Sequence, residues 1–186
     1  SNLYYNESKL KRNEVRVNMA HQIREIGIND VQPFVTLLKT IYDESDYMLY
    51  NPGEYAPSTT DALSKLEHFI TSPTNTIFVA ENNDELVGFA TVTTENLARA
   101  RHEAQFSMGV VKYYRAKGLG QALINAVEAW CLNHDIRRIE VAVVTENTTA
   151  LEMFKSTGYQ IEGELKDKLF IDDRYYNQYI LAKLLL

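Results

Sequence analysis

Hydrophobic and polar residues along this chain follow two periods that alternate from one segment to the next. Apolar residues at every second position predict strands, and apolar residues three and four apart predict helices with one buried face. Alternation over 21–28 predicts a first strand, and an apolar stripe over 34–42 predicts the helix that follows. The same periods predict further strands at 76–80, 86–94, 100–111, 138–144, 159–170 and 175–184, and helices after Ser58 or Thr59, at 118–133 and at 148–156.

Turn-forming residues separate these elements and fix their order. Asn82-Asn83-Asp84 and Asp172-Asp173 predict hairpin turns, and Gly158 is expected to end a helix. Gly88 predicts a bulge or a close packing contact within its strand. The resulting order, β, α, α, β, β, β, α, β, α, β, β, predicts an α/β fold in which helices cover a mixed sheet.

The most informative segment is the run Arg115-Ala116-Lys117-Gly118-Leu119-Gly120, between a strand-like stretch and the helical pattern at 118–133. The first N–H groups of a helix have no partner within it, and the helix dipole adds roughly half a positive charge there. The two glycines let the backbone approach an anion, and Arg115 and Lys117 add cationic side chains. The segment therefore predicts a phosphate-binding turn.

Other glycine motifs compete with this interpretation. The phosphate loop of nucleotide hydrolases requires Gly-Lys-Ser/Thr at its end, whereas Leu119 follows Gly118 here. The dinucleotide fingerprint requires three glycines near the start of a parallel sheet, whereas this run holds two and lies in the second half of the chain. An ordinary tight turn with basic residues fits the spacing as well, so spacing alone leaves both interpretations open.

Two blocks of sequence together resemble one known family. The segment 110–123 resembles the acetyl-CoA-binding motif of the GNAT family of N-acetyltransferases, which is Gln/Arg-x-x-Gly-x-Gly/Ala after a strand that ends in Val. The strand-like residues 139–143, then Asn147, Phe154 and the pair Gly158-Tyr159, resemble a second block of that family. The resemblance covers about 20–186 and is greatest to the RimI, RimJ and phosphinothricin-type bacterial members. It implies a mostly antiparallel mixed sheet of about seven strands, flanked by about four helices, in which the fourth and fifth strands splay apart.

The resemblance also implies acetyl-CoA as the cofactor. Backbone amides of 115–121 would hold its pyrophosphate, and backbone groups of Met108 and Val110 would pair with the pantetheine like an added strand. The Val110 N–H would also polarise the thioester carbonyl. Asn147 would contact the pantetheine or brace the neighbouring helix, although a plain N-cap role fits it equally. The expected cofactor-binding residues are Met108, Val110, Arg115, Ala116, Lys117, Gly118, Leu119, Gly120, Gln121, Asn147 and Phe154.

The candidate catalytic residues are His102 and Glu103, on the strand before the glycine turn. Many relatives carry Glu or His six residues before the Val of the motif, but that residue is Ala104 here. His102 is in phase with Val110, and an ordinary His pKa of about 6.5 suits a base. Glu103 faces the other way unless a bulge intervenes. A surface His and a solvated Glu are the alternatives, and a water chain could connect either residue to the thioester.

The proton donor for the departing thiolate is a second open question. The family often has Tyr at the position of Phe154, which has no hydroxyl. An aromatic ring there can still pack on the pantetheine. Most aromatic residues on strands serve packing, and the remaining candidate donors are Tyr159, Tyr175, Tyr176 and Tyr179.

The acceptor amine is expected between the segment 43–57 and the loop at 170–176. The first of these, with the residue before it, supplies an acidic and aromatic group made of Tyr42, Asp43, Glu44, Asp46, Tyr47 and Tyr50. Carboxylates can hold a second cationic group of an amine, and tyrosines can line its apolar part. A solvated helix end with aromatic packing is the alternative. Asn177 stands where this subgroup has an Asp near the end of the chain.

Composition narrows the class of protein further. The 186 residues, 45% hydrophobic and 24% charged, fit one domain over 19–186, preceded at 1–18 by an N-terminal extension or an expression remnant. A formal net charge of −6 argues against nucleic acid as a partner and permits cationic acceptors. Cys131 is the only cysteine and falls on a core-facing position, so we expect a buried apolar role and no cysteine metal cluster.

We therefore expect an acyltransferase that moves an acetyl group from acetyl-CoA to a primary amine, on a small molecule or a peptide, by direct transfer in a ternary complex. The alternatives are a protein N-terminal or lysine acetyltransferase of the same family, and a non-catalytic CoA-binding sensor. No apolar run approaches the ~20 residues that span a bilayer, and no signal peptide is visible, so we expect no membrane partner and a cytoplasmic setting. We expect no metal. Edge strands near the C-terminus would allow a homodimer.

Overall fold

A computed structural model describes residues 21–185 and has the order of strands and helices that the sequence predicts. The prediction for 1–18 lies outside the described residues. The strands are β1 Gln22–Glu25, β2 Thr76–Asn82, β3 Glu85–Thr94, β4 Glu103–Val110, β5 Arg138–Val144, β6 Gln160–Ile171 and β7 Arg174–Leu184. The helices are α1 Val31–Glu44, α2 Thr59–Thr71, α3 Leu119–Asn133 and α4 Thr148–Ser156, with short 3-10 turns η1 Ile28–Asp30 and η2 Lys112–Tyr114.

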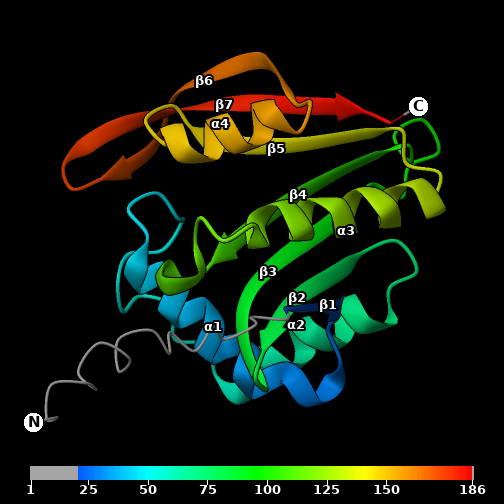
Figure 1. The fold of residues 1–186 in the computed structure, drawn as a ribbon, viewed down its shortest axis with the longest axis vertical. Coiled ribbons are helices and arrows are strands. Elements are labelled where there is room, and N and C mark those ends of the chain that lie inside the picture. The colour runs from blue at the N-terminus through cyan, green and yellow to red at the C-terminus, as the bar shows by residue number, and fades with distance from the viewer. Residues whose placement is uncertain (1–20, 186) are drawn as a thin grey trace, which may run out of the picture.

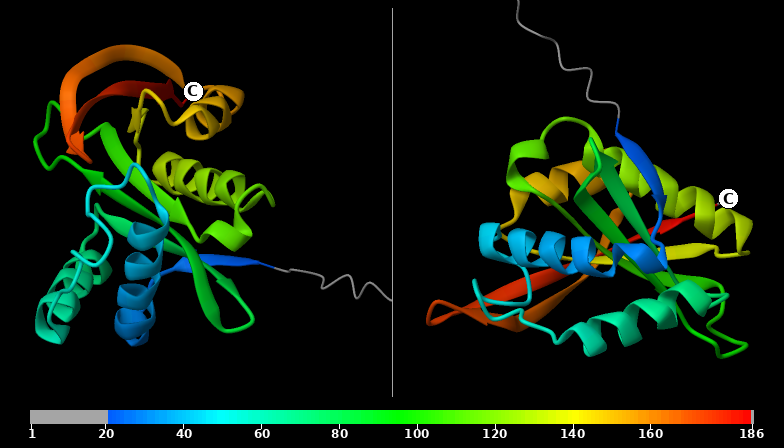
Figure 2. Two further views of the ribbon diagram at one scale, coloured as in Figure 1. Left: turned by 90° about the vertical axis from the view of Figure 1, so that its left-hand side faces the viewer. Right: turned by 90° about the horizontal axis from the view of Figure 1, so that it is seen from below.

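One seven-stranded sheet, in the order β1-β2-β3-β4-β5-β7-β6, forms the centre of the molecule (Figure 1). Neighbouring strands are antiparallel except β4 and β5, which are parallel. The expected fold class, a mostly antiparallel mixed sheet flanked by helices, is therefore confirmed. Helices α1 and α2 lie on one side of the sheet, and α3 and α4 lie on the other (Figure 2).

The central strands are buried on both faces because helices cover both sides. On β2, Ile77 and Val79 pack toward α1 and α2, whereas Phe78 and Ala80 pack toward α3. An apolar run without strict alternation is typical of a strand in this position. Cys131 of α3 is fully buried in the same core, and burial raises its pKa to about 12, so the expected apolar role is confirmed.

Local turn signals predicted most boundaries to within a few residues. Asn83 and Asp84 have positive φ, as do Asp172 and Asp173, which fits the tight hairpin turns expected at both places. The β2–β3 register shifts between Ala80, opposite Gly88, and Glu81, opposite Leu86. The bulge that the sequence placed at Gly88 therefore lies beside that residue.

Two strand predictions were wrong at their ends. The first strand spans only Gln22–Glu25, because Gly27 begins the turn into η1. The side chain of Asp30 accepts from the Gly27 N–H at 2.7 Å and from Arg24 Nη1 at 2.7 Å, so it does not cap α1. The strand expected at 100–111 begins at Glu103, because turn bonds from the N–H groups of Ala100 and Glu103 occupy the preceding residues.

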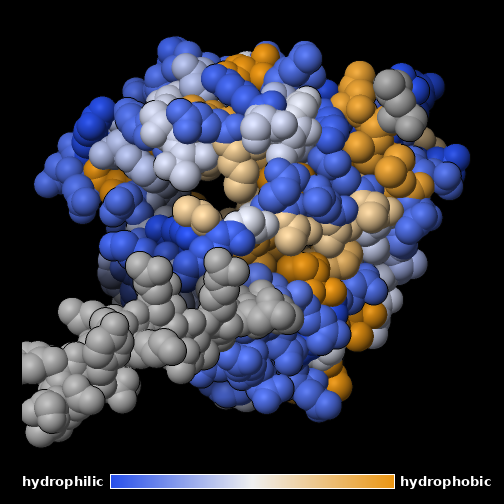
Figure 3. Space-filling view, viewed as in Figure 1, coloured by the Kyte–Doolittle hydropathy of each residue, from blue (hydrophilic) through white to orange (hydrophobic). Residues whose placement is uncertain are grey.

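The splay between β4 and β5 is the feature of the sheet that positions the candidate site. The two strands pair only at Glu103–Arg138, Ala104–Ile139 and Gln105–Glu140, and then diverge. Figure 1 shows the separation widening toward the start of α3, and Figure 3, drawn from the same side, shows a dark opening in the surface there. We call this separation the slot; its closed end lies at the three paired positions and its open end at Val110.

Candidate active site

The glycine turn lies at the open end of the slot, between η2 and α3. Gly118 is the N-cap of α3 with φ +82°, and Ala116 also has positive φ. The first helical bond of the turn runs from Ala122 N–H to the Gly118 carbonyl. Within 21–185, the backbone N–H groups of 116–121 have no acceptor. Unpaired N–H groups at a helix N-terminus favour an anion, and the phosphate at this turn stays a prediction.

The glycines at 118 and 120 serve different purposes. A side chain on Gly118 would meet nothing within 4 Å, so its positive φ is the reason for glycine there. A Cβ on Gly120 would lie 2.7 Å from Met153 Sδ on α4. Gly120 therefore also lets the start of α3 approach α4, a packing role that the sequence did not suggest.

The two cationic side chains of the turn are held by local contacts. Arg115 Nε donates to the Val110 carbonyl at 2.9 Å, across the turn. Lys117 Nζ lies 3.7 Å from the centre of the Tyr113 ring, which is exposed. Neither cation has an ion-pair partner among the residues described, so both charges remain available to an anionic ligand.

The β4 edge of the slot carries backbone groups that pair with no strand. Val111 N–H donates to the Val87 carbonyl, and polar groups alternate in direction along a strand, so odd-numbered residues of β4 bond to β3. Met108 and Val110 therefore direct their N–H groups toward β5, where pairing has already ended at Gln105. An extended ligand with amide groups can add to such an edge as a strand does.

Asn147 and Phe154 both lie on α4 or at its start, beside the slot. Asn147 is the N-cap of α4, and its Oδ1 accepts from Ala150 N–H at 3.2 Å. Asn147 therefore caps α4 through its side-chain oxygen, and its side-chain amide nitrogen stays available to donate a hydrogen bond to a ligand. The Phe154 ring is 3% exposed and packs edge-on against Phe106 and Tyr159. It fills the core under the slot, and its direct contact with a ligand stays a prediction.

The structure does not bring His102 and Glu103 to the glycine turn. β4 has eight residues, so Glu103 and Val110 lie about 23 Å apart along it. Glu103 Oε2 lies 3.9 Å from Arg138 Nε at the closed end of the slot. Arg138 also binds Glu140 and Glu162, so Glu103 belongs to an ion-pair cluster. The catalytic role of these two residues remains a prediction, and the distance disfavours direct contact with a thioester near Val110.

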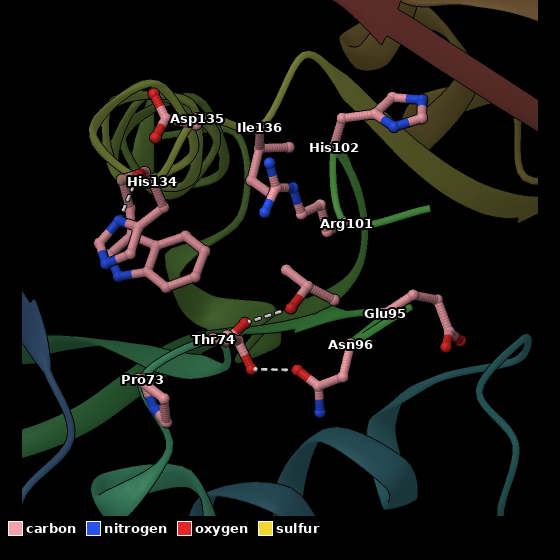
Figure 4. A pocket seen from close by; sticks show the side chains of 11 residues that line it. Pro73, Thr74, Glu95, Asn96, Arg101, His102, His134, Asp135 and Ile136 are labelled. Atoms are coloured by element: carbon pink, nitrogen blue, oxygen red, sulfur yellow. Dashed lines mark hydrogen bonds between the residues drawn. The ribbon is translucent and has the colours of Figure 1, made fainter. Parts of the chain in front are cut away.

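His102 borders a different depression, at the C-terminal end of α3 (Figure 4). This pocket has a volume of about 630 Å³ and contains the stacked rings of Trp130 and His134, 3.9 Å apart. The Arg101 side chain points toward His134, whereas the His102 ring points away from it (Figure 4). Because α3 has fifteen residues, the pocket lies about 20 Å from the glycine turn. It is not continuous with the candidate active site.

The segments expected to hold the acceptor do lie together. The Tyr47 ring contacts the Tyr176 ring of β7 with centroids 6.2 Å apart, which joins the segment 43–57 to the β6–β7 hairpin. Tyr42, Tyr50 and Tyr55 pack against one another within the first segment, with centroids 5.0 to 5.2 Å apart. Burial raises the pKa of Tyr42 to about 12. These tyrosines therefore shape the segment through packing.

Tyr159 is no proton donor to the slot. It is 2% exposed, its hydroxyl has no hydrogen-bond partner among the described residues, and burial, with the nearby charge of Glu128, raises its pKa well above the ordinary value of 10. Tyr175 and Tyr176, on the hairpin, remain accessible in part.

A contact that sequence analysis missed ties the acceptor side to the glycine turn. Glu44, the last residue of α1, accepts a hydrogen bond from Lys112 N–H of η2 at 2.7 Å. The sequence included Glu44 only as one member of an acidic group. No local signal links these two residues, because sixty-eight positions separate them.

Comparison with known proteins agrees with this geometry. The family model of the acetyltransferase (GNAT) family matches residues 39–159, so the chain belongs to the GNAT family. Its fold is similar to an acetyltransferase of that family from Streptococcus pneumoniae, with a TM-score of 0.84 and 23% identity over 89% of this chain and 99% of that one. It is also similar to a phosphinothricin acetyltransferase from Sinorhizobium meliloti in complex with AcCoA, with a TM-score of 0.78 and 16% identity over 90% of this chain and 89% of that one.

Two curated relatives from Escherichia coli K12 align with this chain over only part of their length. The chain is 28% identical to the L-amino acid N-acetyltransferase AaaT over 106 residues, which are 56% of this chain and 65% of that protein. It is 28% identical to a spermidine N(1)-acetyltransferase over 101 residues, which are 54% of this chain and 53% of that protein. The matches thus span about half to two thirds of the relatives' own length. Within 21–185, no helix has both the length and the apolar character needed to cross a membrane.

Proposed function

We propose that this chain is an acetyl-CoA-dependent N-acetyltransferase that acts on a primary amine by direct transfer in a ternary complex. One observation carries the proposal: the unpaired N–H groups of 116–121 adjoin a slot whose β4 edge carries unpaired N–H groups at Met108 and Val110. A phosphate group fits the first feature, and an extended arm with amide groups fits the second. Coenzyme A carries both groups in one molecule. Family membership supports the same donor.

Each cofactor-binding residue receives a role in this proposal. The backbone of Arg115, Ala116, Lys117, Gly118, Leu119, Gly120 and Gln121 holds the pyrophosphate, and Met108 and Val110 hold the pantetheine through their backbone groups. Arg115 and Lys117 add positive charge around the phosphates. The amide nitrogen of Asn147 is available to the pantetheine, and Phe154 supports the slot from the core.

The acceptor is a small amine or a peptide amine bound between the segment 43–57 and the β6–β7 hairpin. The acidic residues of that segment and the net charge of −6 favour a cationic acceptor over nucleic acid. The curated relatives support an amine acceptor, since their names specify L-amino acids and spermidine. A cytoplasmic setting remains part of the proposal. So does a homodimer, because β6 is an edge of the sheet.

A thiol-release assay tests the proposal. Acetyl-CoA would be offered with a panel of small amines, amino acids, polyamines and basic peptides, and free CoA thiol would be measured. Turnover with at least one amine is the expected result. Preference for peptides over every small amine would support a protein acetyltransferase. Tight CoA binding by calorimetry without turnover on any acceptor would support a sensor and contradict the enzyme.

A further inference from the structure

The last residue of α1 lies beside the open end of the slot. Glu44 Oε2 accepts from Lys112 N–H at 2.7 Å, and Lys112 is the second residue after Val110, where β4 ends. Lys112 therefore lies two residues, or roughly 7 Å along the chain, from the proposed thioester position. The carboxylate lies one hydrogen bond, 2.7 Å, beyond the Lys112 nitrogen. Glu103, by comparison, lies at the other end of the strand, about 23 Å away.

Packing between α1 and β4 fixes this position. A Cβ on Gly109 of β4 would lie 2.8 Å from Ile41 Cγ2 and 2.9 Å from Phe89 Cε1, so glycine alone permits this close approach. Gly109 lies between Met108 and Val110, the two residues proposed to hold the pantetheine. Ile41 and Glu44 are three residues apart and lie on the same side of α1. The packing of α1 on β4 therefore places Glu44, at the end of the helix, beside the slot.

Glu44 differs from Asp43 and Glu146 in its partners. Asp43 Oδ1 accepts from Gly53 N–H at 2.8 Å within its own segment. Glu146 forms an ion pair with Arg174 and accepts from Thr145 Oγ1. Glu44 has no paired cation within 21–185, and its Oε1 has no hydrogen-bond donor there. One oxygen thus holds the turn while the other can accept a proton.

We propose that Glu44 is the general base of the acetyl transfer, an inference that rests on the proposed N-acetyltransferase function. As the lone pair of the neutral amine forms the C–N bond with the thioester carbonyl carbon, a proton passes from nitrogen to Glu44. The C–S bond then breaks and the thiolate leaves with the bonding electrons. Glu44 returns the proton to the thiolate, directly or through water, and the products are the amide and CoA thiol. This route needs no tyrosine at position 154.

The substitution Glu44→Gln distinguishes a general base from a residue that only accepts the hydrogen bond of Lys112. The Gln side-chain oxygen can still accept from Lys112 N–H, but an amide cannot take up the proton. We expect kcat to fall about 100-fold or more, which is the usual range for loss of a general base, with CoA affinity within about threefold of wild type. Glu67→Gln removes an exposed carboxylate of α2 and serves as the matched control, with kcat unchanged within about twofold.

Three results would overturn the inference. Full kcat in Glu44→Gln would mean that the carboxylate only supports η2. An equal loss of CoA affinity and kcat would mean that it positions the turn and takes no proton. A wild-type chain that binds CoA and acetylates no amine would end the proposed function and this inference together, whereas wild-type turnover with an active Glu44→Gln would end this inference alone.

Discussion

The two ends of β4 differ in what their polar groups do. At the closed end of the slot, Glu103 joins Glu140 and Glu162 around the single guanidinium of Arg138, so side-chain charges are paired. At the open end, backbone N–H groups of the glycine turn and of Met108 and Val110 have no partner in the part of the chain described. Polar groups without a protein partner bind water or a ligand instead, and most residues of the glycine turn are exposed to both. The comparison supports a structural role for the closed end and favours ligand binding, as proposed, at the open end.

The largest effect should come from closing the anion site. Gly120→Glu would put a negative side chain at the start of α3, where the helix dipole and free N–H groups favour an anion. We expect CoA affinity to fall by about 3 kcal/mol, roughly 100-fold, in isothermal titration.

A packing control is needed because a side chain at 120 also meets Met153. Gly120→Ala brings the same Cβ without charge and should lose far less affinity, since the end of the Met153 side chain can move. If Gly120→Ala and Gly120→Glu lose affinity equally, crowding against α4 explains the loss, and the anion site is not supported.

The second effect tests the approach of α1 to β4. Gly109→Val would place methyl groups where even a Cβ comes within 2.9 Å of Ile41 and Phe89. Overpacking of this kind costs about 2 kcal/mol, so the free energy of unfolding in urea should fall by that amount. Gly163→Val, at a position with no atom within 4 Å of its Cβ, is the control and should be nearly neutral. Equal stability of the two variants would contradict the packing that positions Glu44.

A smaller effect is expected at the closed end of the slot. His102→Ala and Glu103→Gln should each lower kcat less than about tenfold and leave CoA affinity unchanged. Glu103 lies about 23 Å from Val110 along β4, and His102 precedes Glu103. The pH profile of kcat/KM checks this expectation. If either variant loses the rise of kcat/KM with pH that the wild type shows, that residue would be a base that acts through a water chain.

The smallest effect concerns acid stability. The hydrogen bond from Arg138, with its charge, lowers the pKa of Glu162 below the ordinary 4.5. A lowered pKa stabilises the fold above the unfolded-state value, and the contribution is lost as the pH falls through the folded-state value. Arg138→Met should therefore lower Tm most near neutral pH, and the difference from wild type should shrink below about pH 4.5. A Tm difference that is constant with pH would contradict this assignment.

Local sequence signals predicted much of the fold and part of the site. Periodicity and turn residues predicted the order of elements. N-cap preferences offered Ser58 or Thr59 for α2 and allowed Asn147 for α4, and the side chains of Ser58 and Asn147 do accept from Asp61 N–H and Ala150 N–H. The glycine turn was predicted for the same reason, since a strand, a basic glycine run and a helix follow one another within a few residues. These features depend on neighbours in sequence.

Contacts between distant segments could not be predicted in the same way. The bond between Glu44 and Lys112 depends on how α1 packs under β4, and the packing of Gly120 against Met153 depends on where α4 lies. The position of Glu103 depends on the register at which β5 stops pairing with β4. A single sequence carries no local sign of that register, so the distance from Glu103 to Val110 could not be predicted.

The most direct test of the central claim is a crystal structure of the chain with CoA bound. The account predicts the pyrophosphate within hydrogen-bond distance of the N–H groups of 116–121, with the pantetheine along Met108 and Val110 in the slot. A CoA molecule bound elsewhere, such as the pocket beside Arg101 and Trp130, with the glycine turn free of phosphate, would contradict it.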